Sequence, residues 1–152
     1  MDATDGAILR HLQADGRLPN ADLADRVHLS PSPCLRRLKR LEKNGMIRGY
    51  RAILDRRKVG LGLTAFVEIK VSGQSQRRAE ELERAVAKID EIIACYILAG
   101  DADFLLEVTV PDLAAYEQLL LHTLLELPGV FDVRTNFAIR TVKEAGPLPV
   151  ST

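Results

Sequence analysis

The chain has 152 residues, of which 47% are hydrophobic and 28% are charged. This length allows one mid-sized domain or two small ones, and the composition is typical of a globular protein. No apolar run approaches the roughly 20 residues that cross a bilayer, and the first residues lack the charged and apolar regions of a signal peptide. Composition therefore argues against a membrane or exported protein and predicts a cytoplasmic location with no membrane partner.

The net charge of zero conceals an uneven distribution of charge. Residues 1–60 contain 13 Lys and Arg against 7 Asp and Glu, whereas residues 61–152 contain 8 against 14. Ten of the basic side chains lie between Arg36 and Lys58. This asymmetry predicts two domains, and a polyanionic partner such as nucleic acid for the first.

The cysteines and histidines favour neither a disulfide nor a metal centre. Cys34 and Cys95 lie far apart, each inside an apolar pattern, which favours buried reduced thiols. The three histidines, His11, His28 and His122, are scattered and lack the spacing of metal ligands. We therefore expect no metal site and no cofactor.

Residues 4–27 predict two short helices. Thr4 or Asp5 can cap the first, and the Asp-Gly pair at 15–16 is a turn signal that ends it. Asn20 can cap the second helix, whose buried stripe consists of Leu23, Ala24 and Val27. Only two residues connect it to the next helix, so a tight corner is expected.

A third helix begins with a strong start signal, a Ser30 cap followed by Pro31 at the first helical position. It runs to about Asn44, and Gly45 supplies a left-handed stop. At about 100° per residue, its basic residues lie opposite an apolar cluster of Cys34, Leu35, Leu38 and Leu41. Two helices joined by a tight corner, the second with a basic outer face, predict a helix-turn-helix for the major groove of double-stranded DNA.

The outer face of this third helix supplies the candidate DNA-binding residues. Arginine can donate a bidentate pair to guanine, and flanking Lys or Arg can neutralise phosphates. The candidates are Ser32, Pro33, Arg36, Arg37, Lys39, Arg40, Lys43 and, after the helix, Arg48. The alternative is a solvated basic helix packed on a hydrophobic core, but it does not explain the preceding helix and corner.

The segment that follows predicts a strand at 46–54 and a polar, glycine-bounded hinge at 55–62. We therefore predict a helix-turn-helix domain with connecting strand and hinge at residues 1–60, and a second domain at residues 61–152.

The second domain alternates strands with amphipathic helices. Strands are expected at 63–71, 92–98, 104–110 and 130–139, and helices at 75–89 and from 111 to the Pro-Gly break at 128–129. In the first strand, polar and aromatic positions at Phe66, Glu68 and Lys70 alternate with an apolar set, Ala65, Val67, Ile69 and Val71. In the second helix we expect burial of Leu113, Tyr116, Leu119, Leu120 and Leu124.

The order β-α-β-β-α-β predicts a ferredoxin-like α+β domain with both helices on one sheet face. We expect the other face of the sheet to be covered as well, and a second subunit is the simplest way to cover it.

The turn between the second and third strands contains two acids, Asp101 and Asp103, beside Gly100. One interpretation is that Asp and Gly simply favour turns. The other is that a carboxylate binds the ammonium group of a small ligand while turn N–H groups bind its carboxylate. Paired acids also occur in hydrolases, but no nucleophile, metal cluster or phosphate loop accompanies them, so we predict that the chain is not an enzyme.

These segments resemble the Lrp/AsnC (leucine-responsive/asparagine-responsive) family of bacterial and archaeal feast/famine transcriptional regulators. The resemblance covers about residues 5–148 and is most specific at 29–42 (LSPSPCLRRLKRLE), followed by Gly-Met-Ile at 45–47. Residues 100–106 (GDADFLL) and 127–130 (LPGV) resemble the C-terminal signatures of the family.

The resemblance implies an N-terminal winged helix-turn-helix domain and a ferredoxin-like effector domain. It implies dimers that assemble further, commonly into octamers, with an amino acid bound between neighbouring dimers. Asp103 matches the turn acid of the effector response, and the other effector-binding residues that it implies are Leu98, Ala99, Gly100, Asp101 and, from another subunit, Arg134, Thr135 and Asn136. The family often has an aromatic residue where this chain has Ala102, so the identity of the effector is not implied.

Together these features predict a sequence-specific DNA-binding transcriptional regulator that a small effector, an amino acid, modulates. One alternative is an amino-acid-binding module whose helical domain contacts only proteins, and strongly salt-dependent DNA binding would argue against it. A second alternative is an enzyme built on the second domain, which predicts turnover.

Overall fold

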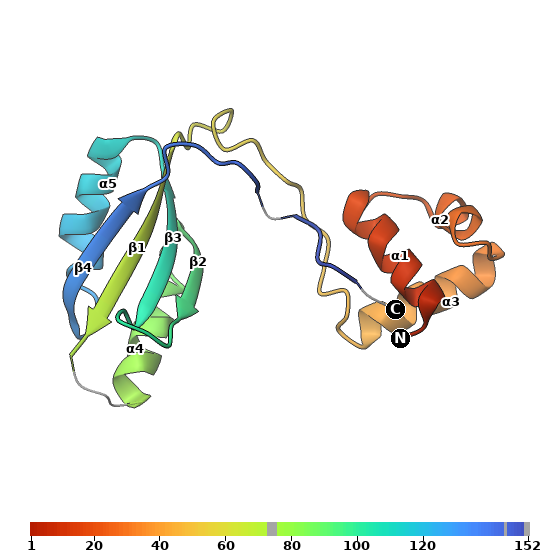
Figure 1. Cartoon of the computed structure of the whole chain (residues 1–152), viewed down its shortest axis with the longest axis horizontal. Coiled ribbons are helices and arrows are strands. Elements are labelled where there is room, and N and C mark those ends of the chain that lie inside the picture. The colour runs from red at the N-terminus through yellow and green to blue at the C-terminus, as the bar shows by residue number, and fades with distance from the viewer. Residues whose placement is uncertain (73–75, 145, 151–152) are drawn as a thin grey trace. The chain divides into compact units, whose positions relative to one another are not determined.

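The computed structural model describes the chain at residues 1–72, 76–144 and 146–150 (Figure 1). The chain forms two compact units, one comprising Met1–Ile53 with the C-terminal segment from Val142, and the other comprising Leu54–Thr141. Each unit contains its own cluster of buried apolar side chains, as independent domains do.

The predicted boundary after residue 60 differs from the structure for two segments. Residues 54–60 belong to the second unit, and the segment from Val142 belongs to the first. Arg56 donates a hydrogen bond of 2.9 Å to the carboxylate of Glu107, within the second unit. The side chain of Gln13 exchanges two hydrogen bonds with the backbone of Leu148, which joins the C-terminal segment to the first unit. Side-chain contacts between positions far apart in the sequence decide which unit each segment joins. Local composition does not predict such contacts.

The first unit is built from three helices, α1 (Ala3–Ala14), α2 (Asn20–Arg26) and α3 (Pro31–Lys43). Their core consists of buried side chains from all three helices and the corner, namely Ile8, Leu23, Ala24, Val27, Cys34 and Leu41. The burial predicted for Leu35 is wrong, because this side chain lies at the rim of the apolar stripe and is 39% exposed.

Helix α1 begins with a capping box, and the caps predicted at Thr4 or Asp5 are wrong. Asp2 is the N-cap, and its Oδ1 accepts a hydrogen bond of 2.8 Å from the N–H of Asp5. The carboxylate of Asp5 in turn accepts from the N–H of Asp2 at 3.2 Å. This reciprocal pair satisfies two N–H groups that have no partner within the helix.

The corner between α2 and α3 is tight, as predicted. His28 adopts a left-handed backbone conformation with φ 55°. Asn20 does not cap α2, whose N-cap is Pro19, and its amide instead donates to the carbonyl of Pro31 at 2.9 Å. The predicted position of the start of α3 is confirmed, with Ser30 as the N-cap and Pro31 in the first turn. The expected hydroxyl cap is wrong, because the side chain of Ser30 makes no capping hydrogen bond.

Helix α3 stops at Gly45, as predicted. Gly45 has φ 72°, and its N–H donates to the carbonyl of Glu42 at 3.0 Å. The N–H of Met46 donates to the carbonyl of Leu41, also at 3.0 Å. These two bonds form a Schellman motif, which requires a left-handed residue and therefore favours glycine.

The strand predicted at 46–54 is wrong. The structure has no strand at these positions, and the described residues of the first unit contain no strand with which the segment could pair. Since a strand is defined by hydrogen bonds to a neighbouring strand, an alternating sequence is not enough to form one. Tyr50 in this segment instead donates a hydrogen bond of 3.0 Å to the carboxylate of Glu42.

The second unit has the predicted β-α-β-β-α-β order. Its strands are β1 (Leu63–Val71), β2 (Ile92–Ile97), β3 (Phe104–Val110) and β4 (Val130–Phe137). Its helical segments are α4 (Gln76–Val86), α5 (Leu113–Leu119) and a π-helical turn η1 (Leu120–Leu124). Residue 75, the predicted start of α4, lies outside the described residues. The strands form one antiparallel sheet in the order β2-β3-β1-β4.

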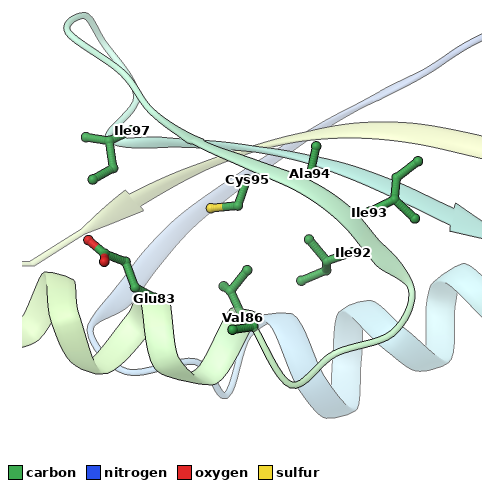
Figure 2. Close-up of a pocket in the computed structure, with 8 residues that line it drawn as sticks. Glu83, Val86, Ile92, Ile93, Ala94, Cys95 and Ile97 are labelled. Carbon is green, nitrogen blue, oxygen red and sulfur yellow. The ribbon is translucent and has the colours of Figure 1, made fainter. Parts of the chain in front are cut away.

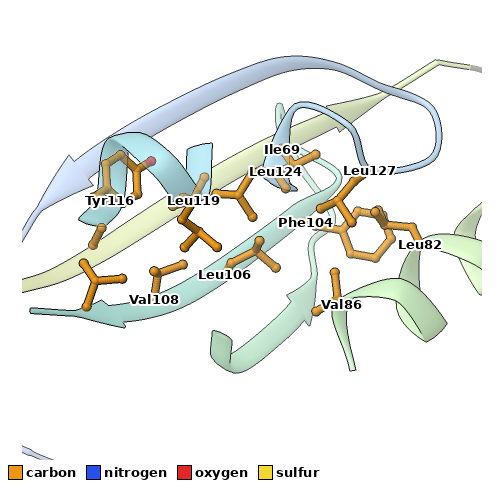
Figure 3. Close-up of a cluster of buried hydrophobic side chains, with 13 residues drawn as sticks. Ile69, Leu82, Val86, Phe104, Leu106, Val108, Tyr116, Leu119, Leu124 and Leu127 are labelled. Carbon is orange, nitrogen blue, oxygen red and sulfur yellow. The ribbon is translucent and has the colours of Figure 1, made fainter. Parts of the chain in front are cut away.

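One face of the sheet packs against both helices, as predicted (Figure 3). The alternation expected for β1 is confirmed, because Ala65, Val67 and Ile69 are buried. These residues and their neighbours on β3 contact a helical set that includes Leu82, Val86, Tyr116, Leu119 and Leu124. The burial predicted for Leu113 is wrong: it is the first residue of α5 and is 62% exposed.

The opposite face of the sheet, which we call the open face, is not covered by either helix. It presents Phe66 and Tyr96 to solvent, and Tyr96 is 54% exposed. Tyr96 pairs with Leu105 across β2 and β3, so the exposed apolar side chains extend over neighbouring strands.

Both cysteines are free thiols, as predicted. Cys34 is buried, but the burial predicted for Cys95 is wrong, because β2 is an edge strand. Among the described residues, no three His, Cys, Asp or Glu side chains gather into a candidate metal site. Nor does any helix in the described part of the chain have the length and apolar character needed to span a membrane.

Candidate functional site

The first candidate site is the outer face of α3. Six of the eight predicted DNA-binding residues are exposed there or just beyond the helix, namely Ser32, Arg36, Lys39, Arg40, Lys43 and Arg48. The other two, Pro33 and Arg37, are half-buried. The structure therefore brings the predicted residues together along one helix and its exit, although they differ in how freely their charges face solvent.

Two of these arginines are held by acids of α1. The guanidinium of Arg40 donates to both oxygens of the Asp5 carboxylate, at 2.8 Å and 2.7 Å. The guanidinium of Arg37 donates to Asp5 at 2.9 Å and to Asp2 at 2.6 Å. Two carboxylates at the start of α1 thus pair with two guanidinium groups on α3, and the four charges sum to zero.

The acids of this network have lowered pKa values. Burial raises the pKa of Asp5, but the hydrogen bonds from Arg37 and from the N–H of Asp2, together with the charge of Arg40, outweigh burial and lower it below its usual value. The pKa of Asp2 is lowered chiefly by the hydrogen bond from the N–H of Asp5 and then by Arg37. Both acids therefore remain ionised at neutral pH and keep the arginines paired.

Asp2 and Asp5 are functional candidates that the sequence interpretation missed. The available signal was a pair of acids three residues apart near one helix start and a pair of arginines, Arg37 and Arg40, with the same spacing on another helix. Residues three apart lie on one helix face, so such pairs can meet. The approach of α1 to α3 was not available from the sequence.

The second candidate site is the turn between β2 and β3, where Asp103 is tied to β1. Its side chain accepts a hydrogen bond of 2.8 Å from the N–H of Val71, and its own N–H donates to the carbonyl of Ile69 at 3.0 Å. The N–H of Leu98 donates to the carbonyl of Asp103 at 2.9 Å and closes the turn. Asp103 therefore joins this turn to the end of β1.

The rest of the turn faces solvent except at one position. Leu98, Ala99, Gly100 and Asp101 are exposed, whereas Ala102 is buried. The carboxylate of Asp101 and the backbone around Gly100 are thus open to a small polar ligand.

The predicted residues of β4 lie on two different sheet faces. Arg134 pairs with Glu68 in the ladder and lies with it on the open face, at 3.9 Å between their charged groups. Thr135 lies on the helical face, where its hydroxyl hydrogen-bonds that of Tyr116. Asn136 returns to the open face opposite Phe66. A single ligand in one chain would therefore not contact all three, and Arg134 and Asn136 are the pair that another subunit could reach.

A groove lies elsewhere in the second unit, between α4 and the edge strand β2 (Figure 2). Its volume is about 430 Å³, and its lining includes Glu83, Val86, Ile92, Cys95 and Ile97. Although Cys95 is an exposed residue, its thiol points into this groove, where desolvation and then the charge of Glu83 raise its pKa. None of the predicted effector-binding residues lines the groove.

The comparisons with known proteins match two family models to successive parts of the chain. A model described as winged helix-turn-helix DNA-binding matches residues 1–48. A model of the Lrp/AsnC ligand binding domain matches residues 64–148. The second model extends to residue 148, whereas the structure assigns the chain from Val142 onward to the first unit.

Relatives cover the chain almost from end to end. The chain is 44% identical to the leucine-responsive regulatory protein of Escherichia coli (strain K12), over 100% of this chain and 93% of that protein. Its fold matches a transcriptional regulator from Neisseria meningitidis, solved as an L-Met complex, with a TM-score of 0.93 and 41% identity over 98% of this chain and 96% of that one. An AsnC family transcriptional regulator from Agrobacterium tumefaciens also matches with a TM-score of 0.93, at 38% identity over 98% and 97% of the two chains. The protein belongs to the Lrp/AsnC family, and it is a DNA-binding transcriptional regulator and not an enzyme.

Proposed function

We propose that this regulator binds double-stranded DNA through the outer face of α3 and changes its binding in response to an amino acid held by its C-terminal domain. The observation that carries the proposal is the row of exposed cations on α3, at Arg36, Lys39 and Lys43, on a helix that a tight corner joins to α2. Phosphate contacts from such cations give affinity, and a helix in the major groove gives sequence recognition.

The DNA-binding proposal is tested with a duplex that the wild-type protein selects from a random-sequence pool. Arg36→Gln is expected to weaken binding about tenfold, because one arginine contact contributes about 1–3 kcal/mol. Arg17→Gln is a matched control, since it removes the same charge from an exposed arginine in the loop between α1 and α2, outside α3. Equal affinities for the wild-type protein and the Arg36 variant would place the DNA contact elsewhere.

For the effector we propose an amino acid with an apolar side chain, because the relatives include a leucine-responsive protein and an L-Met complex. The exposed carboxylate of Asp101 and that of Asp103 would attract the ammonium group, and N–H groups of the turn would bind the carboxylate. A thermal-shift scan of the twenty amino acids tests this proposal. Stabilisation by leucine or methionine and none by aspartate is expected, and stabilisation by acidic amino acids alone would overturn it.

We further propose that the protein acts as a dimer that assembles into larger rings, octamers among them, with the effector between dimers. The exposed Phe66 and Tyr96 of the open face support the dimer, because an apolar sheet face of this kind is normally covered. Arg134 and Asn136 lie on this face and could complete the turn of a neighbouring subunit. Light scattering coupled to size exclusion tests the assembly, and a monomer at micromolar concentration would contradict it.

The proposed cellular compartment of this protein follows from its proposed binding to DNA. A regulator of transcription in bacteria such as those of its relatives acts where the chromosome lies, so we propose the cytoplasm.

A further inference from the structure

The acids of α1 remove part of the positive charge from the DNA-facing helix. Of the basic residues along α3, Arg37 and Arg40 have carboxylate partners within 2.6–2.9 Å, whereas Arg36, Lys39 and Lys43 are exposed. A helix that presents all of its cations freely would attract any phosphate backbone, because this attraction does not depend on base sequence.

Asp5 is the centre of this network and is itself almost inaccessible, at 2% exposure. Its two oxygens accept from both guanidinium groups, and its position is fixed by the capping box with Asp2. For Arg40 to swing out to a phosphate, it would have to leave a buried carboxylate with one partner fewer. Removing a partner from a buried ion pair is strongly unfavourable, so Arg40 is held in place.

The guanidinium of Arg40 is nevertheless not enclosed. Its side chain is 52% exposed, and only its Nη2 donates to Asp5 among the hydrogen bonds of the described residues. Arginine carries five N–H donors in a rigid plane. Asp5 therefore leaves the remaining donors of Arg40 facing outward at a fixed position and orientation.

We propose that Asp5 is a specificity-determining positioning residue for DNA binding, resting on the proposed DNA-binding function of α3. By pairing with Arg37 and Arg40, it lowers the affinity of the helix for phosphate of any sequence. It also fixes the position of the outward donors of Arg40. These donors therefore form hydrogen bonds only with a base edge or phosphate whose acceptor atoms lie at that position.

The test compares the full-length wild-type protein with Asp5→Asn and with the control Asp22→Asn, which makes the same change in charge at an exposed position of α2. Affinity is measured over a range of salt concentrations for a random-sequence duplex and for the duplex selected by the wild-type protein. In Asp5→Asn, we expect the salt dependence on random DNA to steepen by about 0.9 for each arginine released to a phosphate, and thus by up to about 1.8 per bound helix-turn-helix. The ratio of specific to random affinity is expected to fall about tenfold, as for the loss of one well-placed base contact.

A residue needed only for folding would lower both affinities and leave the salt dependence unchanged. A slope for Asp5→Asn equal to that of Asp22→Asn therefore overturns the inference. If the wild-type protein binds no DNA, both the proposed function and this inference are refuted. If wild-type protein binds DNA but the Asp5→Asn slope is unchanged, only the inference fails.

A second pair of variants decides the matter if Asp5→Asn does not fold. Arg36→Gln removes an exposed cation of α3, and Arg40→Gln removes a paired one. We expect Arg36→Gln to reduce the salt dependence on random DNA by about 0.9, and Arg40→Gln to reduce it by less than half as much. Equal reductions would show that Arg40 contacts phosphate freely, contrary to the inference.

Discussion

The hydrogen bond between Asp103 and Val71 allows the structural and ligand-binding roles of the turn to be separated. Asp103→Ala removes the acceptor of the 2.8 Å bond from the N–H of Val71, at a point where the pairing of β1 with β4 shifts register. Because Asp103 is exposed, water can replace part of this bond, and the expected loss is about 1 kcal/mol. For a domain of this size, such a loss lowers the melting temperature by roughly 4–8 °C.

Asp103→Asn is the matched variant, because its amide oxygen can still accept the bond from Val71 while the negative charge is lost. We expect calorimetry of the full-length protein to show a decrease of less than half that of the alanine variant. Neither variant is expected to retain the stabilisation by an apolar amino acid, since both lack the carboxylate for its ammonium group.

Two results would refute this reasoning independently. Equal destabilisation by the alanine and asparagine variants would mean that the bond from Val71 does not account for the stability of the turn. Full stabilisation of Asp103→Asn by leucine or methionine would mean that the carboxylate does not bind the ammonium group. The first result concerns folding and the second concerns recognition, so one can fail while the other holds.

Three further predictions concern a buried core residue, the end of α3 and the charge network of Asp5. Leu106→Ala, at a fully buried position of β3, is expected to lower the free energy of unfolding by about 2–5 kcal/mol in urea titrations, and a loss below 1 kcal/mol would contradict the packing. Gly45→Ala forces an alanine into φ 72° at the end of α3, so a loss of about 1–2 kcal/mol is expected by the same titration, with no loss if the helix can end differently. The lowered pKa of Asp5 means that its contribution to stability is present above its ordinary value of 3.8 and is lost as the pH falls through the lower folded value. Acid titrations followed by circular dichroism should therefore show a weaker decline in stability below pH 4 for Asp5→Asn than for wild type, and parallel curves would argue against the network.

Much of the secondary structure could be predicted from the sequence because its signals are local. The proline in the first turn of α3 and the glycine after the helix act through the local backbone conformation, and the structure confirms the positions of both ends. The strict alternation at Ala65, Val67 and Ile69 likewise records which sheet face is buried. The order of strands and helices follows from such segments, and with it the ferredoxin-like topology.

Predictions that depended on which element packs beside a segment in the folded protein were less successful. The segment 46–54 has the composition of a strand but no partner strand among the described residues. Cys95 has apolar neighbours in sequence, yet it lies on the edge strand β2, where its thiol faces an open groove beside α4 and is not packed in the core. In both cases the deciding factor is what packs beside the segment, and periodicity does not contain that information.

The candidate site shows the same division. The sequence alone determined that α3 is a basic amphipathic helix at the end of a helix-turn-helix, since spacing along one helix places Arg36 and Arg40 on the outer face. Only the tertiary structure decided which of these cations are free. Asp5 lies 35 positions before Arg40, and the packing of α1 against α3 brings their charged groups to 2.7 Å. A charge on a helix becomes available to DNA or is neutralised according to the groups that folding places next to it, and that is a property of packing and not of spacing.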